Sequence, residues 1–201
     1  HSLANVRMTP DQMVAEVGRC VAYARAQAGV QPVLEATLST AFGCTLQGLV
    51  SEDEVLRLSV ALAQAGVDCI SLADTVGYAN PRQMKSMVRR VRPEVGAKLE
   101  AVHLHNTRGL GLANALAAYE EGIRGFDSAM AGLGGCPFAP GAGGNIVTED
   151  LVYLFESMGV STGIDFARLL EARQALVRGL PGEPVHGHVA LAGLPKGFRV
   201  G

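Results

Sequence analysis

The sequence predicts an α/β fold built around a parallel sheet. Short β-rich segments begin near residues 33, 67, 99 and 126, and each is followed by apolar residues at helical spacing. The repeat of about 30 residues is the size of one strand–helix unit with a right-handed crossover. Regular alternation of this kind indicates either an open doubly wound sheet or a barrel, and the periodicity alone does not distinguish them.

Helix starts are the clearest local features. Thr9 precedes Pro10, so we expect threonine as the N-terminal cap and proline at the first helical position. Asn80 and Pro81 begin another helix, and acidic residues after Ser51 favour a further helix start because negative charge is favourable there. The expected helices start at Pro10, Ser51, Pro81 and Thr148 and also cover Gly111–Glu121 and Asp165–Arg178.

The strands are expected between these helices. Val67–Ala73 reads Val-Asp-Cys-Ile-Ser-Leu-Ala, a short segment with β-forming residues that follows the helix-ending Gly66. The four expected strands are Val33–Thr40, Val67–Ala73, Leu99–His105 and Phe126–Ala131. A complete (β/α)8 barrel needs eight strands and roughly 250 residues. The 201-residue chain is therefore expected to be a small open sheet or the C-terminal half of a barrel.

The two ends of the chain carry little regular pattern. Residues 1–9 are expected to be irregular. Residues 179–201 are rich in Gly, Pro and His and are expected to form a loosely structured tail, in which His186 and His188 lie on a surface strand or a disordered end. We therefore expect one domain over residues 1–178, followed by the tail.

Composition narrows the class of protein. Hydrophobic residues make up 48% and charged residues 18%, as in a globular chain. A net charge of −2 gives no general attraction to nucleic acid or anionic membranes, and no apolar run could span a bilayer. The N-terminus lacks the pattern of a signal segment, and four cysteines without CxxC spacing fit reduced thiols in a cytoplasmic protein. Cys20 and Cys69 are expected to pack in the core.

Two histidines are the first candidates for chemistry. His103 and His105 are two residues apart on an expected strand, so alternation places both side chains on one face. They also lie at the C-terminal end of that strand, where parallel α/β folds place their sites. The pair is interpreted as metal ligands, and imidazole favours Zn, Mn, Fe and Co over Mg and Ca. The alternative is a hydrogen-bonded pair of core histidines.

A glycine-rich loop forms the second candidate region. Gly132–Gly144 contains Cys136, whose thiol is either a nucleophile or proton carrier or an ordinary loop cysteine. Asn145 ends the loop just before a helix, so its side chain either caps that helix or coordinates a metal. Asp74 and Thr75 follow an expected strand and are interpreted as facing a substrate, with a turn-capping Asp74 as the alternative.

These motifs resemble the hydroxymethylglutaryl-CoA lyase family. The resemblance covers about residues 1–178 and is most specific in Gly-Leu-Gly-Gly-Cys136-Pro-Phe and the following Gly-Gly-Asn145. Ala-Val-His103-Leu-His105-Asn is similar to the family's metal-binding strand, and Ser-Leu-Ala-Asp74-Thr-Val-Gly matches its sixth barrel strand.

The resemblance implies a TIM barrel of which this chain holds about the last four βα units and a C-terminal helix. It implies a divalent cation, Mg or Mn before Zn or Co, held by His103, His105 and Asn145, with Cys136 as catalytic thiol. It also implies cleavage of 3-hydroxy-3-methylglutaryl-CoA, or a related 3-hydroxyacyl-CoA, to acetyl-CoA and acetoacetate. Asp74 and Thr75 are expected to contact the acyl-CoA.

One departure from the family bears on activity. The family's first strand supplies an Arg-Asp pair and its second strand a Glu, and this chain starts beyond both. We therefore expect little lyase activity from the chain alone, and either a homo-oligomer or completion by a missing N-terminal half. The competing interpretations are a Claisen-type synthase or aldolase of the same superfamily and a non-catalytic half-barrel assembly module.

Overall fold

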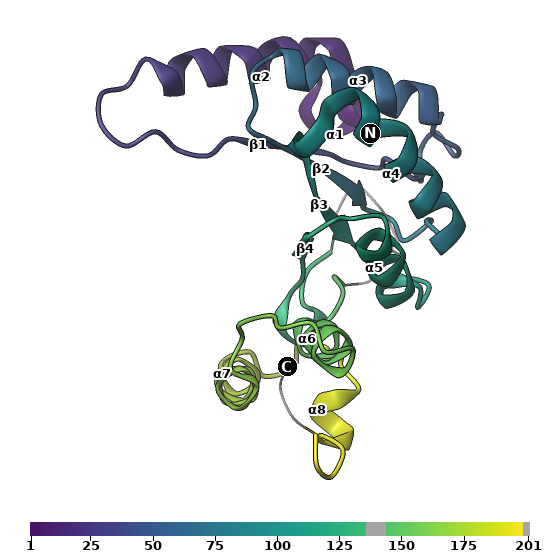
Figure 1. The fold of residues 1–201 in the computed structure, drawn as a ribbon, viewed down its shortest axis with the longest axis vertical. Helices are drawn as coiled ribbons and strands as arrows, with labels where there is room; N and C mark the ends of the chain where they lie inside the picture. The colour runs from purple at the N-terminus through teal and green to yellow at the C-terminus, as the bar shows by residue number, and fades with distance from the viewer. Residues whose placement is uncertain (136–143, 199–201) are drawn as a thin grey trace.

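Four parallel strands form the centre of the molecule. The computed structural model describes residues 1–135 and 144–198, and the strand order in the sheet is β1-β2-β3-β4 (Figure 1). All three strand pairings are parallel. Neighbours in the sheet are therefore consecutive in the chain, as in successive units of a barrel. The strands are β1 Glu35–Leu38, β2 Cys69–Asp74, β3 Leu99–Leu104 and β4 Gly125–Asp127.

Helices follow each strand, and most start where the sequence predicts. Thr9 Oγ1 accepts the backbone N–H of Gln12 at 3.2 Å, and the Gln12 side chain accepts the backbone N–H of Thr9. The two bonds form a capping box. Asn80 Oδ1 accepts Gln83 N–H at 3.0 Å in the same way. The main helices are α2 Pro10–Arg25, α3 Glu52–Gln64, α4 Pro81–Val95, α5 Gly111–Glu120, α6 Thr148–Ser157 and α7 Phe166–Gly179.

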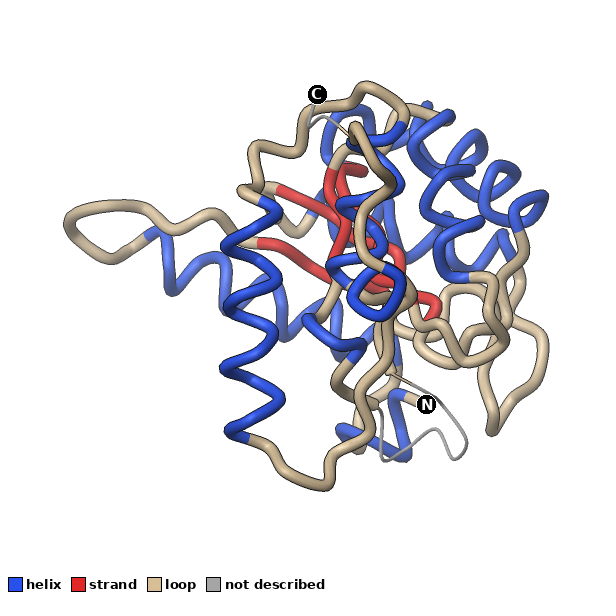
Figure 2. The backbone as a smooth tube through the Cα atoms, turned by 90° about the horizontal axis from the view of Figure 1, so that it is seen from below, coloured by secondary structure: helices blue, strands red, loops and turns tan. Residues whose placement is uncertain are grey.

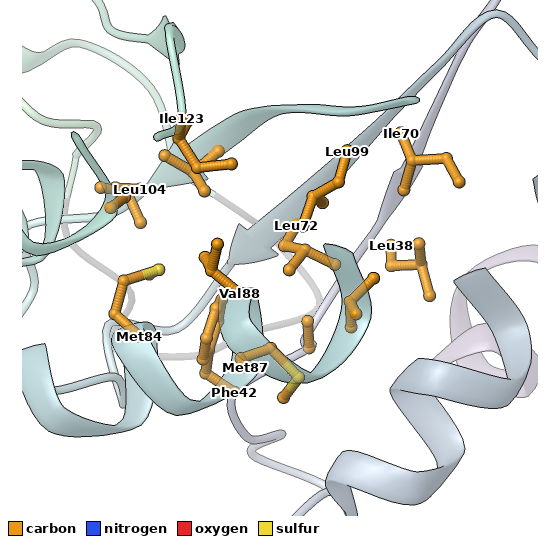
Figure 3. Close-up of a cluster of buried hydrophobic side chains, with 14 of the residues drawn as sticks. Leu38, Phe42, Ile70, Leu72, Met84, Met87, Val88, Leu99, Leu104 and Ile123 are labelled. Atoms are coloured by element: carbon orange, nitrogen blue, oxygen red, sulfur yellow. The ribbon is translucent and has the colours of Figure 1, made fainter. Parts of the chain in front are cut away.

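The core lies between one face of the sheet and the helices. Ala36 and Leu38 on β1 are buried, whereas Glu35 and Thr37 between them are exposed. The parallel register pairs Leu38 with Leu72, and in β2 both faces are covered, since Ile70 to Asp74 are all buried. Figure 3 shows the resulting cluster, which gathers Leu38, Phe42, Ile70, Leu72, Met84, Met87, Val88, Leu99, Leu104 and Ile123. This burial fixes the strands, and their carboxyl ends carry the candidate site.

The N-terminal residues form a helix, contrary to the sequence expectation. Residues expected to be irregular contain α1, Ser2–Val6, which ends at Arg7 in the left-handed conformation. A long connection then separates α2 from β1 and projects from the body of the molecule (Figures 1 and 2). Val30, within this connection, is fully exposed.

The fourth strand is shorter than expected. The predicted strand ran to Ala131, but β4 ends at Asp127, and Ala129 forms only a single bridge with Val147. A 3-10 turn, η2 Met130–Gly132, follows, in which Ala131 and Gly132 have φ values of 58° and 66°. Positive φ at two successive residues is incompatible with an extended strand. The other 3-10 helix, η1 Gly96–Lys98, joins α4 to β3.

The C-terminal tail is packed onto the body. It contains a short helix, α8 Val189–Ala192, whose Val189 is buried against Val152 and Phe166. The carboxylate of Asp150, in the first turn of α6, accepts the backbone N–H groups of His188 and Val189 at 2.9 Å. The expectation of a loosely structured tail is therefore wrong for these residues, because a buried carboxylate and an apolar cluster hold them.

Two cysteine expectations are also wrong. Cys20 is exposed and Cys69 is half-buried, whereas Cys44 is buried. Cys69 lies at the start of β2, and its Sγ–H donates to Glu100 Oε2 at 2.8 Å. The neighbouring carboxylate raises the pKa of the Cys69 thiol to about 11.

In the part of the chain that the structure describes, no helix is long and apolar enough to cross a membrane.

Candidate functional site

Two imidazoles converge at the carboxyl end of β3. The Nε2 atoms of His103 and His105 lie 3.2 Å apart, and their ring planes are tilted by 58°. Both side chains leave the same face because they are two residues apart on one strand. His105 is buried, whereas the His103 side chain retains 31% exposure. Two ring nitrogens at this separation are close enough to bind one cation together.

A carboxylate on the neighbouring strand orients His103. Asp127 Oδ2 lies 3.3 Å from His103 Nδ1, and the register of β3 and β4 places the two residues directly opposite each other. A carboxylate accepts only, so this contact assigns the proton of a neutral His103 ring to Nδ1 and leaves the Nε2 lone pair facing His105. Histidines that bind a metal through one ring nitrogen usually donate the N–H of the other ring nitrogen to a carboxylate or a similar acceptor.

Asn145 is brought next to His105 by backbone pairing. The two residues form an antiparallel bridge, in which Asn106 N–H donates to Gly144 O at 3.1 Å and Ile146 N–H donates to Leu104 O at 3.0 Å. The bonds therefore flank His105 and Asn145, the type of pair in which opposite side chains lie closest. Asn145 Nδ2 donates to Leu133 O at 2.8 Å. Asn145 Oδ1 is buried and has no hydrogen-bond partner among the described residues.

This donor set fits a divalent cation. Ligands at right angles, about 2.1 Å from an octahedral cation, lie about 3.0 Å apart, and the tetrahedral value is about 3.4 Å. The observed 3.2 Å between the two Nε2 atoms falls between these two values. The distance therefore does not distinguish an octahedral from a tetrahedral cation. The unpartnered amide oxygen of Asn145 is available as a third donor. Within residues 1–135 and 144–198, no group of three His, Cys, Asp or Glu side chains completes a metal site.

Asp74 and Thr75 have structural partners. The buried Asp74 carboxylate accepts the backbone N–H groups of Tyr78 at 2.8 Å and Ala79 at 3.1 Å, so both oxygens stabilise the following turn. Burial raises the pKa of the Asp74 carboxyl, and these hydrogen bonds oppose the shift. Thr75 Oγ1 accepts Thr40 N–H at 2.9 Å, which ties two strand ends together. The Asp74 contacts match the turn-capping alternative, and the substrate-binding role of Asp74 and Thr75 stays a prediction.

Cys136 lies outside the described residues. The described residues on either side of that segment are close to the site, because Leu133 contacts Asn145 and Gly144 contacts Asn106. The catalytic role of Cys136 therefore stays a prediction.

Sequence reasoning missed a buried ion pair behind the site. Glu149, in the first turn of α6, has a fully buried side chain, and its Oε1 accepts from Arg173 Nη1 of α7 at 2.9 Å. Both Glu149 oxygens also lie 3.2 Å from Ala131 N. The acidic first turn of α6 was visible in the sequence, but nothing local paired it with Arg173. Asp127 was likewise missed, although its place at the end of a strand beside the histidine strand was a usable signal.

Comparison with known proteins places the chain in a family. A model described as HMGL-like matches residues 1–176. The chain belongs to the HMGL-like family. The expected partial barrel is confirmed, because this HMGL-like chain superposes on solved hydroxymethylglutaryl-CoA lyases. One from Acinetobacter baumannii, in complex with coenzyme A and 3-methylmalate, has a TM-score of 0.87 and 44% identity.

The curated relatives of the HMGL-like chain are lyases. It is 45% identical over 156 residues to (R)-citramalyl-CoA lyase of Chloroflexus aurantiacus, which covers 78% of the chain and 49% of the relative. It is 44% identical over 137 residues to a hydroxymethylglutaryl-CoA lyase of Bacillus subtilis, which covers 68% of the chain and 46% of the relative. The chain thus spans about half the length of these relatives. The A. baumannii alignment covers 98% of the chain and 63% of the solved structure.

Proposed function

We propose that the chain is the C-terminal part of a metal-dependent carbon–carbon lyase. Its substrate is the CoA thioester of a 3-hydroxy acid, in which it breaks a carbon–carbon bond and leaves the thioester bond intact. The observation that carries this proposal is the convergence of two imidazole nitrogens, 3.2 Å apart, beside the buried amide oxygen of Asn145. Family membership supports the reaction class, because the relatives in the comparisons are CoA lyases.

His103, His105 and Asn145 are proposed to hold the cation. Bound there, a divalent cation supplies a Lewis acid that lowers the pKa of the substrate hydroxyl and stabilises negative charge on an adjacent carbonyl. Asp127 keeps the His103 Nε2 lone pair directed into the site. Cys136 is proposed to carry the proton that the thioester enolate takes up after the bond breaks. Mg or Mn is the proposed cation, since an amide oxygen and carboxylates from outside this chain are hard ligands.

The substrate choice lies between two closely related acids. One relative is a lyase of (R)-citramalyl-CoA, and others are lyases of hydroxymethylglutaryl-CoA. Both reactions break the bond beside a tertiary hydroxyl, so the same metal chemistry serves either. We propose hydroxymethylglutaryl-CoA as the substrate because the glycine-rich cysteine loop resembles that family most specifically. A synthase or aldolase is the runner-up, and loss of turnover in a Cys136→Ala variant of the completed enzyme would argue against it.

Activity is proposed to need the rest of a barrel. The chain aligns with about half of its curated relatives, and both outer strands of its described sheet are edges. A polypeptide carrying the missing strands, or a second copy of this chain, would cover them. We propose completion by an N-terminal polypeptide, because the family supplies a metal-binding carboxylate from that half. The cytoplasmic location also stays a proposal.

The decisive experiment is complementation. The chain is purified alone and together with the N-terminal part of the B. subtilis relative, and acetyl-CoA release from hydroxymethylglutaryl-CoA and citramalyl-CoA is measured with Mg²⁺ or Mn²⁺. We expect release only from the mixture, and at least a hundredfold loss for His105→Ala but not for the control His188→Ala. A stable mixture that cleaves neither thioester would contradict the proposed function, and cleavage by the chain alone would contradict the need for completion.

A further inference from the structure

The buried ion pair behind the site is the starting point. Glu149 is fully buried, and its only described cationic partner is Arg173, whose side chain is 10% exposed and belongs to α7, beyond the last βα unit. A buried ion pair is by itself weak evidence for stability, since desolvation offsets much of the attraction. Its use must therefore be sought in what the pair holds in place.

Glu149 holds a strained turn. Both of its carboxylate oxygens lie within hydrogen-bonding distance of Ala131 N–H, and Ala131 has a φ of 58°. A residue with a Cβ rarely adopts this left-handed conformation unless its surroundings impose it. The opposite side of the turn is held by His186 N–H, which donates to Ala131 O at 2.8 Å. The turn is thus fixed by groups from α6 and the C-terminal tail, and Arg173 of α7 pairs with the α6 carboxylate.

The position of this turn determines the orientation of the Asn145 side-chain amide. Leu133 O, two residues after Ala131, accepts Asn145 Nδ2 at 2.8 Å. The oxygen and nitrogen of a side-chain amide have nearly the same shape, so this hydrogen bond decides which atom faces which way. With Nδ2 directed to Leu133, Oδ1 is the atom left without a partner among the described residues, beside His105 in the backbone bridge.

We propose that Arg173 and Glu149 are positioning residues that orient the Asn145 amide toward the cation. Arg173 neutralises the buried carboxylate, the carboxylate holds Ala131 in the left-handed conformation, and the resulting place of Leu133 O directs Asn145 Oδ1 into the site. The inference rests on the proposed function, because it takes Asn145 as a metal ligand. It extends the site to helix α7, which contributes no ligand.

The first test is metal affinity of the full chain. Mn²⁺ titration of Arg173→Met is expected to show affinity lower by 10- to 100-fold, the usual effect of removing a residue that supports a metal ligand. Arg178→Met, an exposed arginine on the same helix, is the matched control and is expected to bind as the parent chain does. Arg173→Gln replaces Arg173→Met if the latter does not fold, under the same criterion. Affinity within twofold of the parent chain would overturn the inference.

A second variant tests the route through the turn. Glycine adopts positive φ without strain, so Ala131→Gly is expected to restore most of the affinity of Arg173→Met in the double variant. If the double variant stays as weak as Arg173→Met, the turn is not the connection and the inference fails.

A measurement without metal separates this inference from the proposed function. Hydrogen exchange of the peptide spanning residues 129–135 is expected to be at least tenfold faster in Arg173→Met than in the parent chain or in Arg178→Met. Unchanged exchange would overturn the inference whatever the metal affinity. Failure of the parent chain to bind Mn²⁺, with the exchange difference present, would instead count against Asn145 as a ligand and against the proposed function.

Discussion

Asp127 Oδ2 lies 3.3 Å from His103 Nδ1, so a carboxylate on β4 determines which nitrogen of a histidine on β3 is free to bind. The free nitrogen of His103 is therefore set by the contact between the two side chains. The carboxylate is 52% exposed and the imidazole 31% exposed, and the parallel register holds them opposite each other. The relation is a local one, because it involves only two neighbouring strands, β3 and β4.

The Asp127–His103 contact predicts an effect of Asp127 on metal binding. Asp127→Asn permits the amide nitrogen to face Nδ1, which shifts the ring proton to Nε2 and removes the lone pair from the site. We expect Mn²⁺ affinity to fall by about 10- to 100-fold, as for other groups that orient a metal-binding histidine. Isothermal titration of the full chain measures this, with Glu171→Gln, an exposed acid on α7, as the control. Equal affinities for the two variants would contradict the assignment.

Asp74 predicts a component of stability that depends on pH. Burial raises the pKa of its carboxyl in the folded chain, so the folded state holds the proton more tightly than the unfolded state. The contribution to stability is fully present below the unfolded pKa of 3.8 and is lost as pH rises through the folded pKa. The difference in unfolding free energy between the parent chain and Asp74→Asn, measured in urea at several pH values, should show this decline, and a difference that does not change with pH would contradict it.

The same substitution should also cost stability near neutral pH. Two backbone N–H groups, those of Tyr78 and Ala79, point at the two Asp74 oxygens, and an amide offers only one oxygen. Leaving one buried donor unpaired costs about 1–3 kcal/mol. An unfolding free energy equal to that of the parent chain would indicate that the turn does not need both acceptors.

Glu100 is expected to suppress the reactivity of Cys69. The Glu100 carboxylate accepts a hydrogen bond from the Cys69 thiol and raises the pKa of that thiol to about 11 from an ordinary value of 9.0. Little thiolate is therefore present at pH 8. Glu100→Gln removes the charge, and alkylation of Cys69 by iodoacetamide at pH 8 should become roughly tenfold faster. Cys20, which is exposed, serves as the internal reference in both proteins. An unchanged ratio of the two rates would show that Glu100 does not control the thiol.

Asp150 is expected to hold the C-terminal tail. Its carboxylate accepts the backbone N–H groups of His188 and Val189, the first bonds of the short helix α8. Asp150→Ala removes these acceptors, so residues 181–198 should detach from α6 and become sensitive to proteases. Limited proteolysis followed by mass spectrometry locates the cuts. Val185→Ala, a change at an exposed tail residue, is the control and should leave the cleavage pattern unchanged.

The features that the sequence predicted are local ones. Thr9-Pro10 and Asn80-Pro81 start helices because the cap and the first turn are adjacent in the chain. His103 and His105 share a face because strand alternation needs only two residues. The predicted strands and helices match the structure except at their ends. The family resemblance then distinguished a barrel from an open sheet, which periodicity could not do.

The features that it missed depend on residues far apart in the chain. His103 and Asp127 are separated by 24 positions, as are Glu149 and Arg173, and no local pattern links either pair. The expected strand cannot reach Ala131, because that residue has a φ of 58° and its N–H is held by Glu149 in a turn. Residues 188 and 189 of the tail are held by Asp150 and an apolar cluster, although the composition of the tail is typical of a loose end.

The projecting connection between α2 and β1 has a practical consequence. Its two ends are tied together, since Asp68 Oδ2 accepts Leu34 N–H at 2.8 Å and an N–H of Arg25 Nη2 at 2.5 Å, while Val30, in the middle of the connection, is fully exposed. A fluorophore or spin label attached at residue 30 would therefore report on rotation and assembly of the whole body without touching the strand ends. Labelled in this way, the chain could be watched as it captures a complementary polypeptide.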